Sequence, residues 1–134
     1  MTEKLTLREK DLSDSSFEMV NLEGVRFNNA NLGHAQFEDV NLAGAKFNDI
    51  NFSDVVFSRA QLGGTVFTQL GLPPGSPEKQ RGIRFEDADM NDSVFLDCNL
   101  QNARIEKCNT TGMTIDGVLV SDLLAAYAKQ NGTP

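Results

Sequence analysis

The segment that decides the fold spans residues 20–68 and reads VNLEGVRFNNANLGHAQFEDVNLAGAKFNDINFSDVVFSRAQLGGTVFT. A leucine or phenylalanine returns at every fifth position of this segment, beginning at Leu22 and ending at Phe67. A small or β-branched residue stands two positions before each of them, from Val20 to Thr65. Because an α-helix repeats its side-chain pattern about every 3.6 residues and a β-strand about every 2, this period indicates a different, repeating architecture.

Units such as ANLGH (residues 30–34), AKFND (45–49) and ADMND (88–92) resemble the repeat of the pentapeptide-repeat family, whose consensus is A-(D/N)-L-x-x. The resemblance covers about residues 10–117, and many units in phase make it specific. It implies an all-β fold, a right-handed quadrilateral β-helix with one pentad on each side and four pentads in each coil. The central residue and the residue two before it would then point inwards.

Physical reasoning supports the same arrangement. One coil cannot bury its own apolar side chains, so coils must stack, with equivalent residues roughly 4.8 Å apart. Residues twenty positions apart, such as Phe17, Phe37 and Phe57, would form interior columns. Asparagine or aspartate precedes most of the leucine-type positions, and we expect these side chains to bond the local backbone at turns. These are Asp11, Asn21, Asn31, Asn41 and Asn51.

The domain organisation follows from where the repeat continues and where it stops. Residues 1–134 form one domain, with a first repeat block over 10–70, a loop over 71–82 that holds three of the four prolines, and a second block over 83–117. The period resumes at Phe85, and one further pentad around Leu72 would keep the leucine and phenylalanine sides in phase. We expect about five coils, a height of roughly 24 Å. Residues 1–9 suggest a short strand over the first coil.

The C-terminal segment, residues 118–134, has a different pattern. Ser121 is a suitable N-cap, and apolar residues at helical spacing predict a helix over 122–130. A solenoid end exposes unpaired backbone, so the helix is expected to cap the last coil. Dimerisation is the alternative role. The contact residues in either case are Leu123, Leu124 and Tyr127.

Composition narrows the classes of function. The net charge of −7 disfavours direct binding to nucleic acid or to an anionic membrane. The N-terminal residues are too polar for a secretory signal and no stretch is apolar enough for a membrane span, so we expect a cytoplasmic protein. His34 is expected to be a solvated surface residue, and Cys98 and Cys108 to be reduced and buried on opposite interior walls. We identify no catalytic, cofactor-binding or metal-binding residue, and an enzyme is the least favoured class.

The most distinctive surface feature is a row of acidic residues on one side of the expected coil. Stacked like charges destabilise a sheet, so this row is not explained by folding. Two interpretations are open: binding of a basic partner, and a solvated face that keeps the protein soluble. The candidate partner-binding residues are Glu18, Glu38, Asp39, Glu86, Asp87 and Glu106.

Two functions are compatible with this sequence. The first is a non-enzymatic interaction scaffold with an unidentified protein partner. The second comes from the family resemblance, which implies a DNA-mimicking protein that binds a type II topoisomerase such as gyrase and confers fluoroquinolone resistance. Seven net charges over roughly 24 Å give about one per 3.4 Å, whereas duplex DNA carries one per about 1.7 Å.

Overall fold

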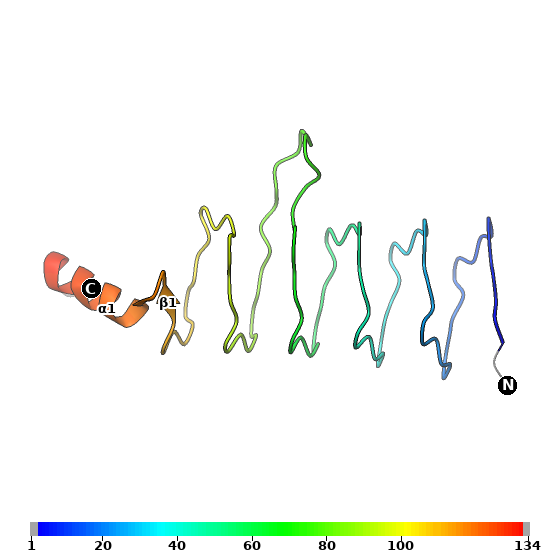
Figure 1. The fold of residues 1–134 in the computed structure, drawn as a ribbon, viewed down its shortest axis with the longest axis horizontal. Coiled ribbons are helices and arrows are strands. Elements are labelled where there is room, and N and C mark those ends of the chain that lie inside the picture. The colour runs from blue at the N-terminus through cyan, green and yellow to red at the C-terminus, as the bar shows by residue number, and fades with distance from the viewer. Residues whose placement is uncertain (1–2, 133–134) are drawn as a thin grey trace. The chain divides into compact units, whose positions relative to one another are not determined.

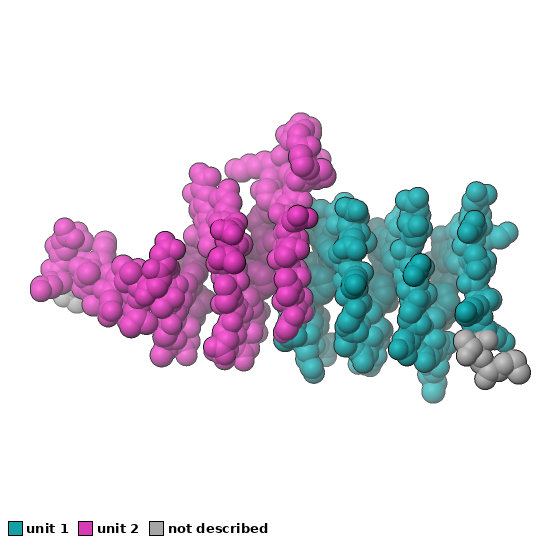
Figure 2. Space-filling view, viewed as in Figure 1, with its two compact units in different colours: residues 1–63 teal, residues 64–134 magenta. Residues whose placement is uncertain are grey.

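The computed structural model describes residues 3–132. The chain separates into two compact units, Met1–Gly63 and Gly64–Pro134, which Figure 2 shows in different colours. Each unit is described by itself. Regular secondary structure in the described residues is confined to the second unit and consists of β1 (Thr114–Ile115), β2 (Val118–Leu119) and α1 (Val120–Asn131).

The first unit is a succession of extended segments joined by two kinds of turn (Figure 1). In the first kind, the carbonyl of the central residue accepts a hydrogen bond from the amide three residues later, at 2.9 Å from Leu22 to Val25 and at 3.0 Å from Leu32 to Ala35. The residue just before the donor has a positive φ. This hydrogen bond and this φ are the signature of a type II β-turn. The positive-φ residues are Asp14, Gly24, His34, Gly44 and Asp54, with φ of 59°, 75°, 63°, 77° and 62°.

The second kind of turn lies midway between successive turns of the first kind. It is a bend around one residue whose φ falls between 51° and 54°. The residues at these bends are Glu9, Met19, Asn29, Asp39, Asp49 and Arg59. The two kinds therefore alternate every five residues, in phase with the predicted alternation of leucine and phenylalanine sides.

Side chains before the first kind of turn stabilise it, as predicted. The Oδ1 atom of each accepts a hydrogen bond from the backbone amide two residues later, at 2.9–3.1 Å. Phe52 has this turn although it is a phenylalanine, because Asn51 precedes it. An asparagine or aspartate before the central position therefore predicts this kind of turn better than the type of the central residue does. The acceptors are Asp11, Asn21, Asn31, Asn41, Asn51, Asp89, Asn99 and Asn109.

The second unit keeps this alternation on both sides of the proline-rich loop. Asp87 has a φ of 51°, which is typical of the bend, and the amide of Ser93 donates to the carbonyl of Met90 at 3.2 Å. Within the loop, the amide of Ser76 donates to the carbonyl of Pro73, and Gly75 has a φ of 80°. The loop therefore supplies one turn of the first kind, at Pro73 and not at the predicted Leu72, and the two kinds of turn still alternate between the bends at Gln69 and Asp87.

The end of the second repeat block differs from the prediction of pentads up to residue 117. β1 and β2 form an antiparallel hairpin in which Thr114 pairs with Leu119 and Ile115 with Val118. Asp116 and Gly117, with φ of 47° and 80°, form its two-residue turn. An Asp-Gly pair favours this type I′ geometry because both positions need a positive φ. The dipeptide between apolar residues was the sequence signal for the hairpin.

The predicted C-terminal helix is present, but its start is different. α1 begins at Val120 and not at 122, and its N-cap is Leu119, whose side chain makes no capping hydrogen bond. Ser121 lies inside the first turn, so its predicted role as N-cap is wrong. The hairpin explains this difference, because the amide of Val120 donates to the carbonyl of Met113 at 3.0 Å and fixes the chain direction before Ser121. The predicted stop is close, since α1 ends at Asn131 and Gly132 has a φ of 84°.

The predicted interior is not closed in this structure. None of residues 3–132 is buried, and Phe17, Phe37 and Phe57 are 58%, 58% and 64% exposed. Within either unit, no two described residues twelve or more positions apart bring their Cα atoms within 8 Å. The turns of the first kind form through hydrogen bonds that span two or three residues, so they do not depend on a neighbouring coil. Stacking depends on contacts twenty residues apart, and these are not made.

Two smaller predictions are also wrong, because successive coils do not stack in this structure. Cys98 and Cys108 are exposed, not buried. Residues 3–9 form no strand, because a strand needs a hydrogen-bonded neighbour and none of the described chain supplies one there. The first two residues of that predicted strand lie outside the described residues.

Candidate interaction surface

The four candidate glutamates occupy equivalent places in the repeat. Glu18, Glu38, Glu86 and Glu106 each follow an inward-predicted apolar residue and precede the positive-φ residue of a bend. All four are exposed. The sequence period and the repeated bend therefore present four carboxylates in the same local backbone setting, two in each unit.

In the second unit, arginines compensate these carboxylates. Arg84 Nη2 lies 3.0 Å from Glu86 Oε2, and Arg104 Nη1 lies 3.5 Å from Glu106 Oε1. Side chains two positions apart in an extended segment point to the same face, which explains both pairs. The glutamate side chains are 64% exposed in both pairs, so each pair contributes about 0–1 kcal/mol.

In the first unit, polar uncharged residues stand where the second unit has arginines. Ser16 Oγ donates a hydrogen bond to Glu18 Oε1 at 3.3 Å, and Gln36 stands two positions before Glu38. Within the described part of the chain, neither glutamate forms an ion pair. Sequence reasoning treated the acidic row as uniform. The R-x-E spacing at Arg84 and Arg104 was the signal that separates the two units.

The remaining two acidic candidates have a different setting from the glutamates. Asp39 and Asp87 are themselves the bend residues, each with a φ of 51°. Aspartate is among the few non-glycine residues that tolerate this region of backbone conformation. Within either unit, acidic candidates of successive coils, such as Glu18 and Glu38 or Glu86 and Glu106, do not bring their Cα atoms within 8 Å of each other.

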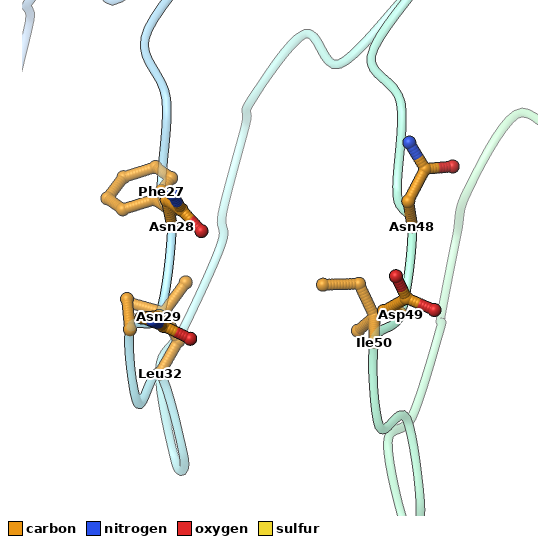
Figure 3. A pocket seen from close by; sticks show the side chains of 8 residues that line it. Phe27, Asn28, Asn29, Leu32, Asn48, Asp49 and Ile50 are labelled. Atoms are coloured by element: carbon orange, nitrogen blue, oxygen red, sulfur yellow. The ribbon is translucent and has the colours of Figure 1, made fainter. Parts of the chain in front are cut away.

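A hollow of about 550 Å³ lies within the first unit between two segments of the repeat that are twenty residues apart. Figure 3 shows Phe27, Asn28, Asn29 and Leu32 on one segment and Asn48, Asp49 and Ile50 on the other. Three pairs of lining residues are twenty positions apart: Asn28 with Asn48, Asn29 with Asp49, and Ala30 with Ile50. The hollow is thus the space between equivalent sides of two coils, and coil stacking would fill it.

The predicted contact residues of the helix are uncovered. Leu123, Leu124 and Tyr127 are 43%, 60% and 63% exposed. Asn131 Nδ2 donates a hydrogen bond to the carbonyl of Tyr127 at 3.0 Å, near the end of α1. Neither capping nor dimerisation is observed for these three residues, and both stay predictions.

The two cysteines bond to backbone carbonyls two residues before them. The Sγ atoms of Cys98 and Cys108 donate to the carbonyls of Leu96 and Glu106, both at 3.3 Å. Residues 3–132 contain no group of three histidine, cysteine or acidic side chains placed to hold a metal ion. Over the same residues, no helix has the length and apolarity needed to cross a membrane.

One carboxyl group has a clearly altered acidity. The Ser13 hydroxyl donates to Asp11 Oδ1 at 2.6 Å, and the Ser13 amide donates to the same atom at 3.0 Å. Both hydrogen bonds stabilise the ionised form and so lower the pKa of Asp11 below its ordinary value of 3.8. The bond from the hydroxyl has the larger effect and the bond from the amide the smaller.

Comparison with known families gives the same result for both repeat blocks. A family model described as "Pentapeptide repeat region" matches residues 1–67, which is half of the chain. A second, described as "Pentapeptide repeats (8 copies)", matches residues 81–109. No curated protein and no solved structure matches the chain. The same two turns alternate on either side of the loop, and the family models match both repeat blocks. The chain therefore belongs to the pentapeptide-repeat family, whose repeats imply a β-helix type of fold.

Proposed function

We propose that this chain is a non-enzymatic, cytoplasmic scaffold that binds another protein through the acidic face of a closed right-handed quadrilateral β-helix of about five coils. The apolar residues support closure. The accessible surface is 14993 Å², whereas a compact protein of 14.7 kDa exposes roughly 6,900 Å². Removing apolar area from water is the main driving force of folding, so the exposed leucines and phenylalanines favour stacking of successive coils.

The turns support four sides in each coil. Within the first unit each kind of turn returns every ten residues, with φ of 51–54° at the bends and 59–77° at the turns of the first kind. Two turns of each kind therefore fit in twenty residues, which would place Asp14, His34 and Asp54 at one corner in successive coils. The lining of the hollow by residues twenty positions apart supports the same coil length.

The observation that carries the binding role is the difference between the two units at the acidic row. Glu86 and Glu106 are compensated by arginines, whereas Glu18 and Glu38 have none. In a closed coil Glu18 and Glu38 would lie one above the other at roughly 4.8 Å. Two like charges so placed disfavour folding, and a basic surface on a partner would relieve their repulsion.

The test is capture of a partner from the native cytosol by the immobilised chain. Glu38→Lys should abolish capture of a specific protein. Glu23→Lys is the matched control, because Glu23 also follows a central residue but lies on a different predicted side. Equal capture by both variants would refute the acidic row as the binding surface.

A type II topoisomerase is the second candidate partner, and the uncompensated carboxylates of the first unit favour it. Glu18 and Glu38 could stand in for two phosphates of a DNA backbone. The expected outcome is that purified protein inhibits supercoiling by gyrase or protects it from ciprofloxacin. Absence of both effects at about 50 μM protein, a generous limit for a specific complex, would eliminate this partner.

A further inference from the structure

The bend residues carry an unusual distribution of charge. Asparagine and aspartate are enriched at positive φ, whereas long side chains are uncommon there. Arg59 and Lys107 nevertheless have φ of 54° and 55°. Among the bend residues of the described chain they are the two basic ones. Glu9, Met19 and Gln69 are also long side chains at bends with this φ, so the backbone position alone does not explain the two basic residues. What distinguishes them is where their charges fall in the repeat.

The position of each basic residue in the repeat suggests which acidic side chain it would face. Arg59 follows Asp39 by twenty residues within the first unit, and Lys107 follows Asp87 by twenty residues within the second. All four residues have φ between 51° and 55°, so they occupy the same kind of bend. The intervening bends of the described residues carry no basic residue, and in a closed coil they would form another column: Glu9, Asn29, Asp49, Gln69 and Asp97.

We propose that Asp39 with Arg59, and Asp87 with Lys107, form ion pairs between successive coils and so fix the register in which the coils stack. This inference rests on the closed coil of the proposed function. Closure would place equivalent side chains on neighbouring coils roughly 4.8 Å apart, close enough for an acid and a base to pair. A slip by one pentad would bring each basic residue beside a different corner and lose the pair.

The pairs also change how the acidic face is interpreted. Asp39 and Asp87 were candidate partner-binding residues, but in these pairs their carboxylates are neutralised within the chain. A repulsive column of glutamates would then run beside an attractive column of alternating charge. The attractive column gives the stack a preferred register that the glutamates alone do not supply.

The experiment measures how Lys107→Asp changes thermal unfolding of the full chain in three backgrounds: the unmodified chain, Asp87→Asn and Asp97→Asn. Lys107→Asp should lower the midpoint by about 2–5 °C, because it replaces an attraction by a repulsion. In the Asp87→Asn background the same substitution should lower it by less than half as much. Asp97→Asn is the matched control background, because it removes the same charge from a bend of the other column, and there the full loss should persist.

The outcomes distinguish a failure of the ion-pair proposal from a failure of the closed coil. An equal loss in all three backgrounds would overturn the ion-pair proposal. A cooperative melt of the unmodified chain would support the closed coil whether or not the pairs exist, and its absence would refute the closed coil itself. Sodium chloride at about 1 M should shrink the loss caused by Lys107→Asp, since salt screens exposed charges; an undiminished loss would contradict an electrostatic origin.

Discussion

Truncation of Phe37 to alanine tests whether the coils close. Phe37 is 58% exposed in the structure. Full burial of a phenylalanine removes about 150–250 Å² from water, so closure would bury a further ~90–145 Å². At about 25 cal/mol per Å², this area corresponds to roughly 2–4 kcal/mol of the free energy of unfolding. Phe37→Ala should therefore destabilise a closed coil by about 3 kcal/mol.

The assay is thermal unfolding followed by circular dichroism. With an unfolding entropy of about 2.1 cal/mol/K per residue, 1 kcal/mol shifts the midpoint of a chain of 134 residues by roughly 3.6 °C. We expect Phe37→Ala to lower the midpoint by about 11 °C. Val56→Ala is the control, because Val56 is 84% exposed and lies at an outward-predicted position; it should change the midpoint by less than about 2 °C.

A loss at Phe37 no larger than that at Val56 would refute the closed coil. Burial of Phe37 against a second copy of the chain would also produce a large loss. Repeating the melts at tenfold dilution separates the two cases, since only burial between chains makes the midpoint depend on concentration.

Three further predictions concern local structure. Asn31→Ala removes the acceptor of the Gly33 amide, now 2.9 Å away, and should lower the free energy of unfolding by about 1 kcal/mol in chemical denaturation; an unchanged midpoint would contradict the role given to this side chain. Gly117→Ala forces an alanine to a φ of 80° and should cost about 1–2 kcal/mol in the same assay, whereas retained stability would argue against the hairpin turn. Because hydrogen bonds from Ser13 lower the pKa of Asp11, its ionised form stabilises the folded state above pH 3.8 and this contribution is lost as the pH falls through the lowered pKa. Asp11→Asn should therefore flatten the decline of the melting midpoint below pH 4, and an identical decline would contradict the assignment.

The sequence predicted most of the local geometry. The five-residue period and the hydrogen bonds of residues such as Asn21 and Asn41 involve neighbours a few positions apart. Such interactions are encoded by short patterns, so a single sequence reveals them. The same reasoning could have found the hairpin, because Asp116-Gly117 between apolar residues is a strong short-range signal.

The rest depends on contacts between distant residues. Stacking, and with it the burial of Phe17 or Cys98, requires pairs twenty positions apart to meet, and local turn preferences do not ensure this. The start of α1 was misplaced for a related reason. Ser121 is a good capping residue by type, but the hydrogen bond from Val120 to Met113 across the hairpin determines where the helix begins.

The charges of the acidic face can be divided according to what would neutralise them. Arginines within the same segment neutralise Glu86 and Glu106, at 3.0 and 3.5 Å. The proposed pairs between coils would neutralise two of the aspartates. Of the six candidate acidic residues, Glu18 and Glu38 then remain without an ion pair, and both lie in the first unit. A partner that binds this face through charge should therefore contact the first repeat block, and a small basic patch on the partner would suffice, since an extended row of charge is not needed to match two carboxylates.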